Sequence, residues 1–185
     1  MCGFLYTGAD LGGFGVDTTE DLVLRWLELG IFTPLMRNHS AMGTRVQEAY
    51  RFEKIDGFRH IIGMRYKLLP YLYSEYMKAV LRDEMMFRPL AFDYPEDRRA
   101  VKVEDQLLLG DGMMIAPVYE QNAEGRYVYL PERMKLVRFK EDGTKEEEIL
   151  EKGDHYVEVA LTDVIFFIRP DHLIPMATGG QCVDE

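Results

Sequence analysis

The sequence predicts two structural parts, an α/β segment followed by an antiparallel β-sandwich. In the first part, two short apolar runs flank a helical pattern, and polar side chains follow each run. In the second part, short runs with the period-2 alternation of strands recur between turn signals. A strand–helix–strand order with polar residues after each strand is the arrangement in which α/β enzymes place their working residues.

The first two strands are predicted from the apolar runs. Residues 4–7 form the first run, and the glycine-rich segment 8–14 follows it. Residues 31–36 form the second run, and polar residues 37–39 follow it. Because the carboxyl ends of neighbouring parallel strands meet at one edge of a sheet, a carboxylate (Asp10), an aromatic ring and an imidazole are expected to face one pocket.

Two helices are predicted in the same part. Asp17 and Glu20 have the spacing of a capping box, and Gly30 fits the end of the first helix. The second helical pattern covers residues 56–82 and continues on both sides of Pro70, which predicts a kinked but continuous helix. The apolar face of the first helix is expected to contain Leu22, Trp26 and Leu29.

The second part, from about residue 85 to residue 170, predicts an antiparallel sandwich. The dipeptide Asp142-Gly143 predicts a hairpin turn. The acidic residues 146–148 predict an exposed edge strand, where charge blocks unwanted pairing. The expected strands are residues 106–109, 113–118, 126–130, 135–139, 155–159 and 164–168. Two strands can neither close a barrel nor form a doubly wound sheet, so the first part is expected to be the end of a larger domain.

Composition excludes several classes of function. The chain has 185 residues, of which 47% are hydrophobic, so a packed core is expected. The net charge of −10 argues against nucleic-acid partners and against binding to an anionic membrane surface. Cys2 and Cys182 form neither a disulfide framework nor a zinc spacing, which favours a reducing, cytoplasmic compartment. No metal or organic cofactor is implied.

Six segments follow one another in the chain: residues 8–14 (GADLGGF), the helix end Arg25-Trp26-x-x-Leu29-Gly30, and residues 36–40 (MRNHS), 65–73 (RYKLLPYLY), 105–111 and 116–118. In this order they resemble glycoside hydrolase family 31, the α-glucosidase and α-xylosidase family. The resemblance runs from residue 3 to about residue 170. It implies the last two βα units of a (β/α)8 TIM barrel within residues 1–84, then the proximal C-terminal β-sandwich at residues 85–170. Residues 171–185 would begin a linker toward a distal domain.

The resemblance implies a retaining mechanism in which one carboxylate is the nucleophile and another the acid/base. Neither family motif occurs in this chain, so the reacting pair is expected upstream and the isolated chain is expected to be inactive. The expected parent is an exo-acting α-glycosidase that removes terminal α-linked glucose from oligosaccharides. The expected partner of this chain is the N-terminal part of the same barrel. The resemblance is also compatible with a homo-oligomer.

By the same resemblance, four residues belong to the sugar site. Asp10 would accept hydrogen bonds from sugar hydroxyls, Phe14 would pack against the apolar face of the sugar, and His39 would bond a ring hydroxyl. Arg37 would orient a pocket carboxylate, while Asn38 would hold the loop. The alternatives are a loop cap for Asp10, core packing for Phe14 and a structural role for His39.

A second hypothesis is a non-catalytic carbohydrate-binding or interaction module that functions as these 185 residues. The missing catalytic motifs favour it. The incomplete barrel argues against this hypothesis, because the inner face of two βα units alone would expose an apolar patch and an unpaired strand. Within the family, the residues of this chain do not separate α-glucosidases from α-xylosidases or other members.

Overall fold

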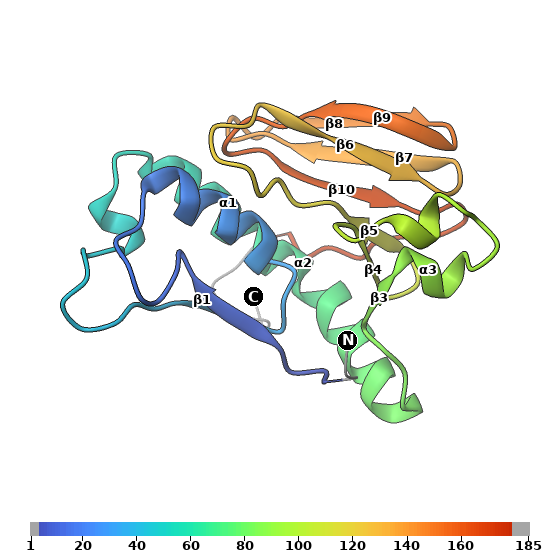
Figure 1. Ribbon diagram of the computed structural model, residues 1–185, viewed down its shortest axis with the longest axis horizontal. Helices are drawn as coiled ribbons and strands as arrows, with labels where there is room; N and C mark the ends of the chain where they lie inside the picture. Colours follow the sequence, from blue (N-terminus) through green and yellow to red (C-terminus); the bar gives the residue numbers. More distant parts are fainter. Residues whose placement is uncertain (1–3, 179–185) are drawn as a thin grey trace.

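The computed structural model describes residues 4–178, and Figure 1 shows its elements stacked in layers. A parallel pair of strands, β1 and β2, lies on one side, and the antiparallel strands lie on the other. Helix α1 lies between them and contacts the long helix α2. Both cysteines and residues 179–185 of the predicted linker lie outside the described residues.

The parallel pair begins later in the chain than predicted. Strand β1 spans Gly8–Leu11 and β2 spans Leu35–Asn38, with Asp10 opposite Arg37. The predicted bounds, residues 4–7 and 31–36, are therefore wrong. Asp10 and Arg37 lie within the strands, and His39 directly follows β2.

Two residues account for this displacement. The guanidinium of Arg65 donates to the carbonyls of Ile31 at 2.7 Å, Thr33 at 2.7 Å and Pro34 at 3.2 Å, so these oxygens are bound by a side chain instead of a strand ladder. At Gly8, an added Cβ would lie 2.1 Å from the carbonyl oxygen of Leu35. The strands can approach this closely only beside a glycine.

Helix α1 (Glu20–Gly30) begins after Thr19, not after the predicted cap Asp17. Thr19 Oγ1 accepts a hydrogen bond from the backbone N–H of Leu22 at 3.2 Å, whereas Asp17 Oδ1 accepts from that of Arg45 at 2.6 Å. The predicted apolar face is wrong at Leu22, which is exposed, and Trp26 is only partly buried. Because α1 packs against both β1 and α2, its buried apolar residues are Val23, Leu24 and Leu27.

Helix α2 (Ile55–Arg82) confirms the long helix predicted over residues 56–82 and continues through Pro70. It ends at Asp83, which has the left-handed conformation with φ 55°. Among the described residues, no helix is long and apolar enough to span a membrane. Three short helical segments were not predicted: η1 (Ala49–Arg51), α3 (Leu90–Asp93) and η2 (Ala100–Lys102).

The antiparallel part contains a six-stranded sheet in the order β3-β4-β5-β10-β7-β8 and a two-stranded sheet of β6 and β9. The predicted turn at Asp142-Gly143 joins β7 to β8, and β8, with the acidic residues 146–148, lies at a sheet edge as predicted. The strands are β3 (Phe87–Pro89), β4 (Leu107–Leu109), β5 (Met113–Ile115), β6 (Gly125–Leu130), β7 (Met134–Phe139), β8 (Lys145–Leu150), β9 (Gly153–Glu158) and β10 (Val164–Ile168).

The sequence VIFFI of β10 shows how the six-stranded sheet is buried on both faces. Val164 and Phe166 pack in a cluster that includes residues of α1 and α2, whereas Ile165 and Phe167 pack in a second cluster with residues of β6 and β9. Successive side chains of a strand point to opposite faces, so a strand without polar residues fits a sheet covered on both sides. The helices therefore cover one face and the two-stranded sheet covers the other.

Candidate functional site

Asp10 and Arg37 meet across the parallel pair. Arg37 Nε donates to Asp10 Oδ1 at 2.8 Å, and Arg37 Nη2 contacts the same oxygen. The side chains of Arg37 and Asp10 are 52% and 23% exposed, so the pair is open to solvent. Among the described residues, Asp10 Oδ2 accepts no hydrogen bond. The side chain of Asp10 thus pairs with Arg37 instead of capping a turn, and it keeps one oxygen available.

Phe14 and His39 lie beside each other at the same edge. Their ring centroids are 5.4 Å apart and the rings are tilted by 36°. Phe14 is 50% exposed, which is inconsistent with a core residue. Gly12 and Gly13 both have φ of +94°, a conformation that favours glycine, and they turn the chain between Asp10 and Phe14. The structure therefore places the four predicted site residues as two contacting pairs, Asp10 with Arg37 near the ends of β1 and β2 and Phe14 with His39 just beyond them.

A buried glutamine that the sequence analysis missed connects these ends. Gln47 Nε2 lies 3.0 Å from Asn38 Oδ1 and 3.1 Å from the carbonyl oxygen of His39, and it also approaches carbonyls that follow β1. Asn38 Nδ2 donates back to the Gln47 carbonyl at 2.8 Å, so Asn38 holds the loop as predicted. A polar residue in a predicted loop carries no sequence signal of burial.

Buried Arg25, paired with Glu28, connects α1 to the sandwich. Arg25 donates to Glu28 Oε2 at 3.0 Å and to the carbonyls of Ala123 at 2.8 Å, Val159 at 2.9 Å and Ala160 at 3.1 Å. Burial raises the pKa of Glu28 to about 8, and the positive charge of Arg25 opposes this increase. These groups set the orientation of α1 against the sandwich, and they do not reach the exposed site.

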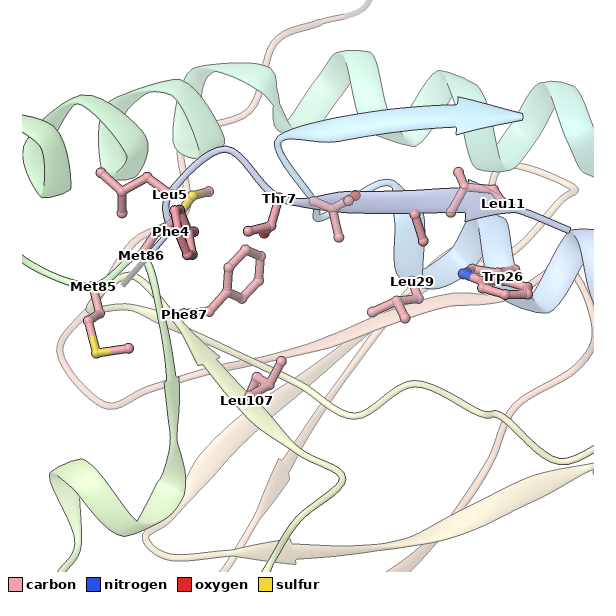
Figure 2. A pocket seen from close by; sticks show the side chains of 13 residues that line it. Phe4, Leu5, Thr7, Leu11, Trp26, Leu29, Met85, Met86, Phe87 and Leu107 are labelled. Atoms are coloured by element: carbon pink, nitrogen blue, oxygen red, sulfur yellow. The ribbon is translucent and has the colours of Figure 1, made fainter. Parts of the chain in front are cut away.

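An apolar hollow of about 480 Å³ lies elsewhere, between β1, α1 and the sandwich strands β3 and β4 (Figure 2). Figure 2 shows Trp26 and Leu29 of α1 on one side and Phe87 and Leu107 on the other. The partly buried Trp26 is thus a lining residue and not the core residue predicted. Such a lining offers few hydrogen-bond partners to sugar hydroxyls. The hollow is therefore a surface suited to packing against apolar side chains.

The remaining histidines make local contacts. Within residues 4–178, no group of three or more His, Cys, Asp or Glu side chains has an arrangement that could hold a metal ion. Each of the other histidines contacts a backbone carbonyl: His60 that of Phe139, His155 that of Glu151 and His172 that of Pro170.

Comparison with known families assigns both parts of the chain. Residues 1–75 match the TIM-barrel domain of glycosyl hydrolases family 31. Residues 83–174 match the C-terminal domain of the same family. The chain belongs to glycoside hydrolase family 31. The resemblance noted in the sequence is thereby confirmed for both parts.

Family 31 relatives are much longer than this chain. A probable alpha/beta-glucosidase from Arthroderma benhamiae is 36% identical over 172 residues, which cover 91% of this chain and 19% of that protein. The lysosomal alpha-glucosidase of Bos taurus is 40% identical over 134 residues, 71% of this chain and 14% of that protein. A family 31 dextranase from Flavobacterium johnsoniae, complexed with glucose, superposes with a TM-score of 0.75 at 32% identity, over 89% of this chain and 20% of that chain.

Proposed function

We propose that this chain forms the carboxyl-terminal part of the catalytic barrel, and the sandwich that follows it, of a retaining, exo-acting α-glycosidase. The observation that carries the proposal is the joint position of Asp10, Arg37, Phe14 and His39 at the carboxyl ends of two parallel strands. In (β/α)8 enzymes, active sites are built at this end of the strands.

The proposed ligand is the terminal α-linked glucose of a gluco-oligosaccharide. Its support is that relatives are named as α-glucosidases and that the similar dextranase is described as complexed with glucose. Asp10 Oδ2 accepts hydrogen bonds from hydroxyls, which a charged acceptor binds more strongly than a neutral one. Phe14 covers an apolar face of the sugar, and His39 bonds a ring hydroxyl. Arg37 holds the Asp10 carboxylate in place.

The two reacting carboxylates are proposed to lie on earlier strands of the same barrel, at the separation of about 5–5.5 Å typical of retaining enzymes. This chain then carries no catalytic residue. We assign the last two βα units to residues 1–84, the sandwich to residues 85–170, and the start of a linker to residues 171–185. The edge of β1 that does not pair with β2 and the apolar hollow (Figure 2) are the surfaces assigned to the earlier barrel, because parallel sheets are normally covered.

The experiment that tests this proposal uses the complete enzyme that carries this segment. Asp10→Ala and His39→Ala are expected to reduce kcat/KM on a terminal α-glucoside by a few kcal/mol of transition-state binding, about the worth of a lost charged hydrogen bond. Tyr50→Ala, at an exposed position after the loop, is the control and should leave kcat/KM unchanged. Activity within about twofold of wild type for both site variants would contradict the proposal.

The alternative is a non-catalytic carbohydrate-binding module, favoured by the absence of the family's reacting motifs from this chain. Titration of the 185-residue chain with glucose or maltose, together with gel filtration, separates the two. A monomer that binds sugar on its own supports the module, whereas aggregation or no binding supports part of an enzyme. Turnover of a chromogenic α-glucoside by the pure chain would contradict both.

A further inference from the structure

The side-chain amide of Gln47 contacts the ends of both strands of the parallel pair. On the β1 side, Nε2 lies 3.4 Å from the carbonyl oxygen of Leu11 and 3.3 Å from that of Gly13. On the β2 side, it lies 3.0 Å from Asn38 Oδ1 and 3.1 Å from the carbonyl oxygen of His39. Gln47 is only 3% exposed, so these contacts are sheltered from water.

The chemistry of the amide makes this contact specific. An NH2 group has two N–H donors, and here it is surrounded by four acceptor oxygens, so the donors are shared between the two strand ends. The opposite orientation of the amide would place its own oxygen against these four oxygens. Gly12 leaves room for the amide to approach this closely. An added Cβ there would lie 3.3 Å from Gln47 Nε2 and 3.0 Å from a methyl group of Val23.

We infer that Gln47 is a positioning residue for the sugar site. By joining the segment after β1 to the segment after β2, it sets the spacing of Asp10 and Phe14 relative to His39. Phe14 directly follows Gly13, and His39 directly follows Asn38, so the bonded groups are the nearest backbone neighbours of the site residues. The inference rests on the proposed function of the site, and it adds a residue that does not itself touch the sugar.

The first test replaces Gln47 with leucine in the complete enzyme. A misplacement of about 1 Å can reduce a rate by about 100-fold, so kcat/KM is expected to fall by about 10- to 100-fold. The inhibition constant for glucose is expected to rise as well, because Asp10 and His39 contact the sugar itself. In the double variant with His39→Ala, the losses should be less than additive, since Gln47 acts through His39.

Gln106→Leu is the matched control. Gln106 is also buried, and it pairs with the backbone of Tyr129 through both its amide oxygen and its amide nitrogen, at 2.8 Å each. It lies in the sandwich, away from the strand ends. Its replacement should lower the Tm without changing kcat/KM or the effect of His39→Ala. If Gln47→Leu behaves in the same way as this control, the inference is overturned.

Two further measurements decide the case if Gln47→Leu does not fold. In Gln47→Glu, an ionised carboxylate has no hydrogen to donate, whereas the protonated acid donates one. Burial among acceptor oxygens disfavours the ionised form, so activity relative to wild type should be largely kept at pH 6 and should fall as the pH rises to 9. A flat ratio overturns the inference. In the 185-residue chain, the nuclear Overhauser contact between the Phe14 and His39 rings should be lost in Gln47→Glu at pH 9, where the carboxyl is ionised. This contact requires no sugar, so it separates failure of the inference from failure of the proposed function.

Discussion

At the scale of single residues, burial separates the arginines of the family segments into two kinds. Arg25 and Arg65 donate to backbone carbonyls and hold elements together. Arg37 is half-exposed and pairs with a carboxylate at the ends of the strands. The family resemblance singles out Arg37 as the arginine that orients a carboxylate, and the different surroundings of the three show what separates it physically from Arg25 and Arg65.

Arg37→Ala is expected to change the free energy of unfolding by less than about 1 kcal/mol, because exposed ion pairs contribute little to stability. It should nevertheless weaken glucose inhibition of the complete enzyme, since Asp10 loses the group that orients it. Arg37→Lys, which keeps the charge but not the planar fork, should give an intermediate inhibition constant. Urea unfolding and inhibition kinetics are the measurements. Lost stability with unchanged inhibition would contradict the assignment.

At the scale of elements, the two parallel strands are displaced toward the carboxyl end relative to their apolar runs. The first run, with Phe4 and Tyr6 exposed, is not even buried, and a hydrophobic run does not show which backbone groups enter a ladder. That choice is made by partners distant in sequence, Arg65 for β2 and Leu35 for β1.

Gly8→Ala tests the close approach of the strands. Because the added Cβ would lie 2.1 Å from the carbonyl oxygen of Leu35, the pair must separate, and we expect a loss of at least about 1–3 kcal/mol in the free energy of unfolding. Gly15→Ala is the control, since a Cβ there meets no atom within 4 Å. Chemical denaturation of both variants is the measurement, and equal effects would refute the packing explanation.

The start of α1 provides a separate test. Thr19→Ala removes the oxygen that accepts from the Leu22 N–H and should cost about 1 kcal/mol of stability. Thr19→Asp keeps an acceptor and adds a negative charge near the helix N-terminus, so it should retain stability. Thermal unfolding of the two variants is the measurement. A similar loss in both would mean that Thr19 is not the effective cap.

At the scale of the whole molecule, the barrel segment and the sandwich share one core. Phe32, which follows α1, meets Phe166 of β10 edge-on, with ring centroids 6.4 Å apart. Arg25 adds polar contacts across the same boundary. The position of the proposed sugar site therefore depends on the sandwich, although no predicted site residue lies in it.

Glu28→Gln tests this boundary through pH. Burial raises the pKa of Glu28 to about 8 from the ordinary value of 4.5, so the folded chain keeps a proton that the unfolded chain releases. The resulting stabilisation is complete below pH 4.5 and is lost as the pH rises to about 8. In Glu28→Gln, the decrease in unfolding free energy between pH 5 and pH 8 should shrink by on the order of 4 kcal/mol, about 1.4 kcal/mol for each pH unit.

The control is Glu148→Gln, at an exposed position of β8. It should leave the pH dependence of stability unchanged. Urea unfolding at both pH values is the measurement. An unaltered slope in Glu28→Gln would show that Glu28 is ionised throughout.

The sequence by itself determined the family, the two-part organisation, the long helix, the hairpin at Asp142-Gly143 and the acidic edge strand, because each depends on local periodicity, turn chemistry or an ordered set of segments. Only the tertiary structure decided the strand bounds, the cap at Thr19 and the burial of Gln47. These depend on hydrogen bonds and close contacts between residues that the chain brings together only when it folds, and no local pattern records such partners.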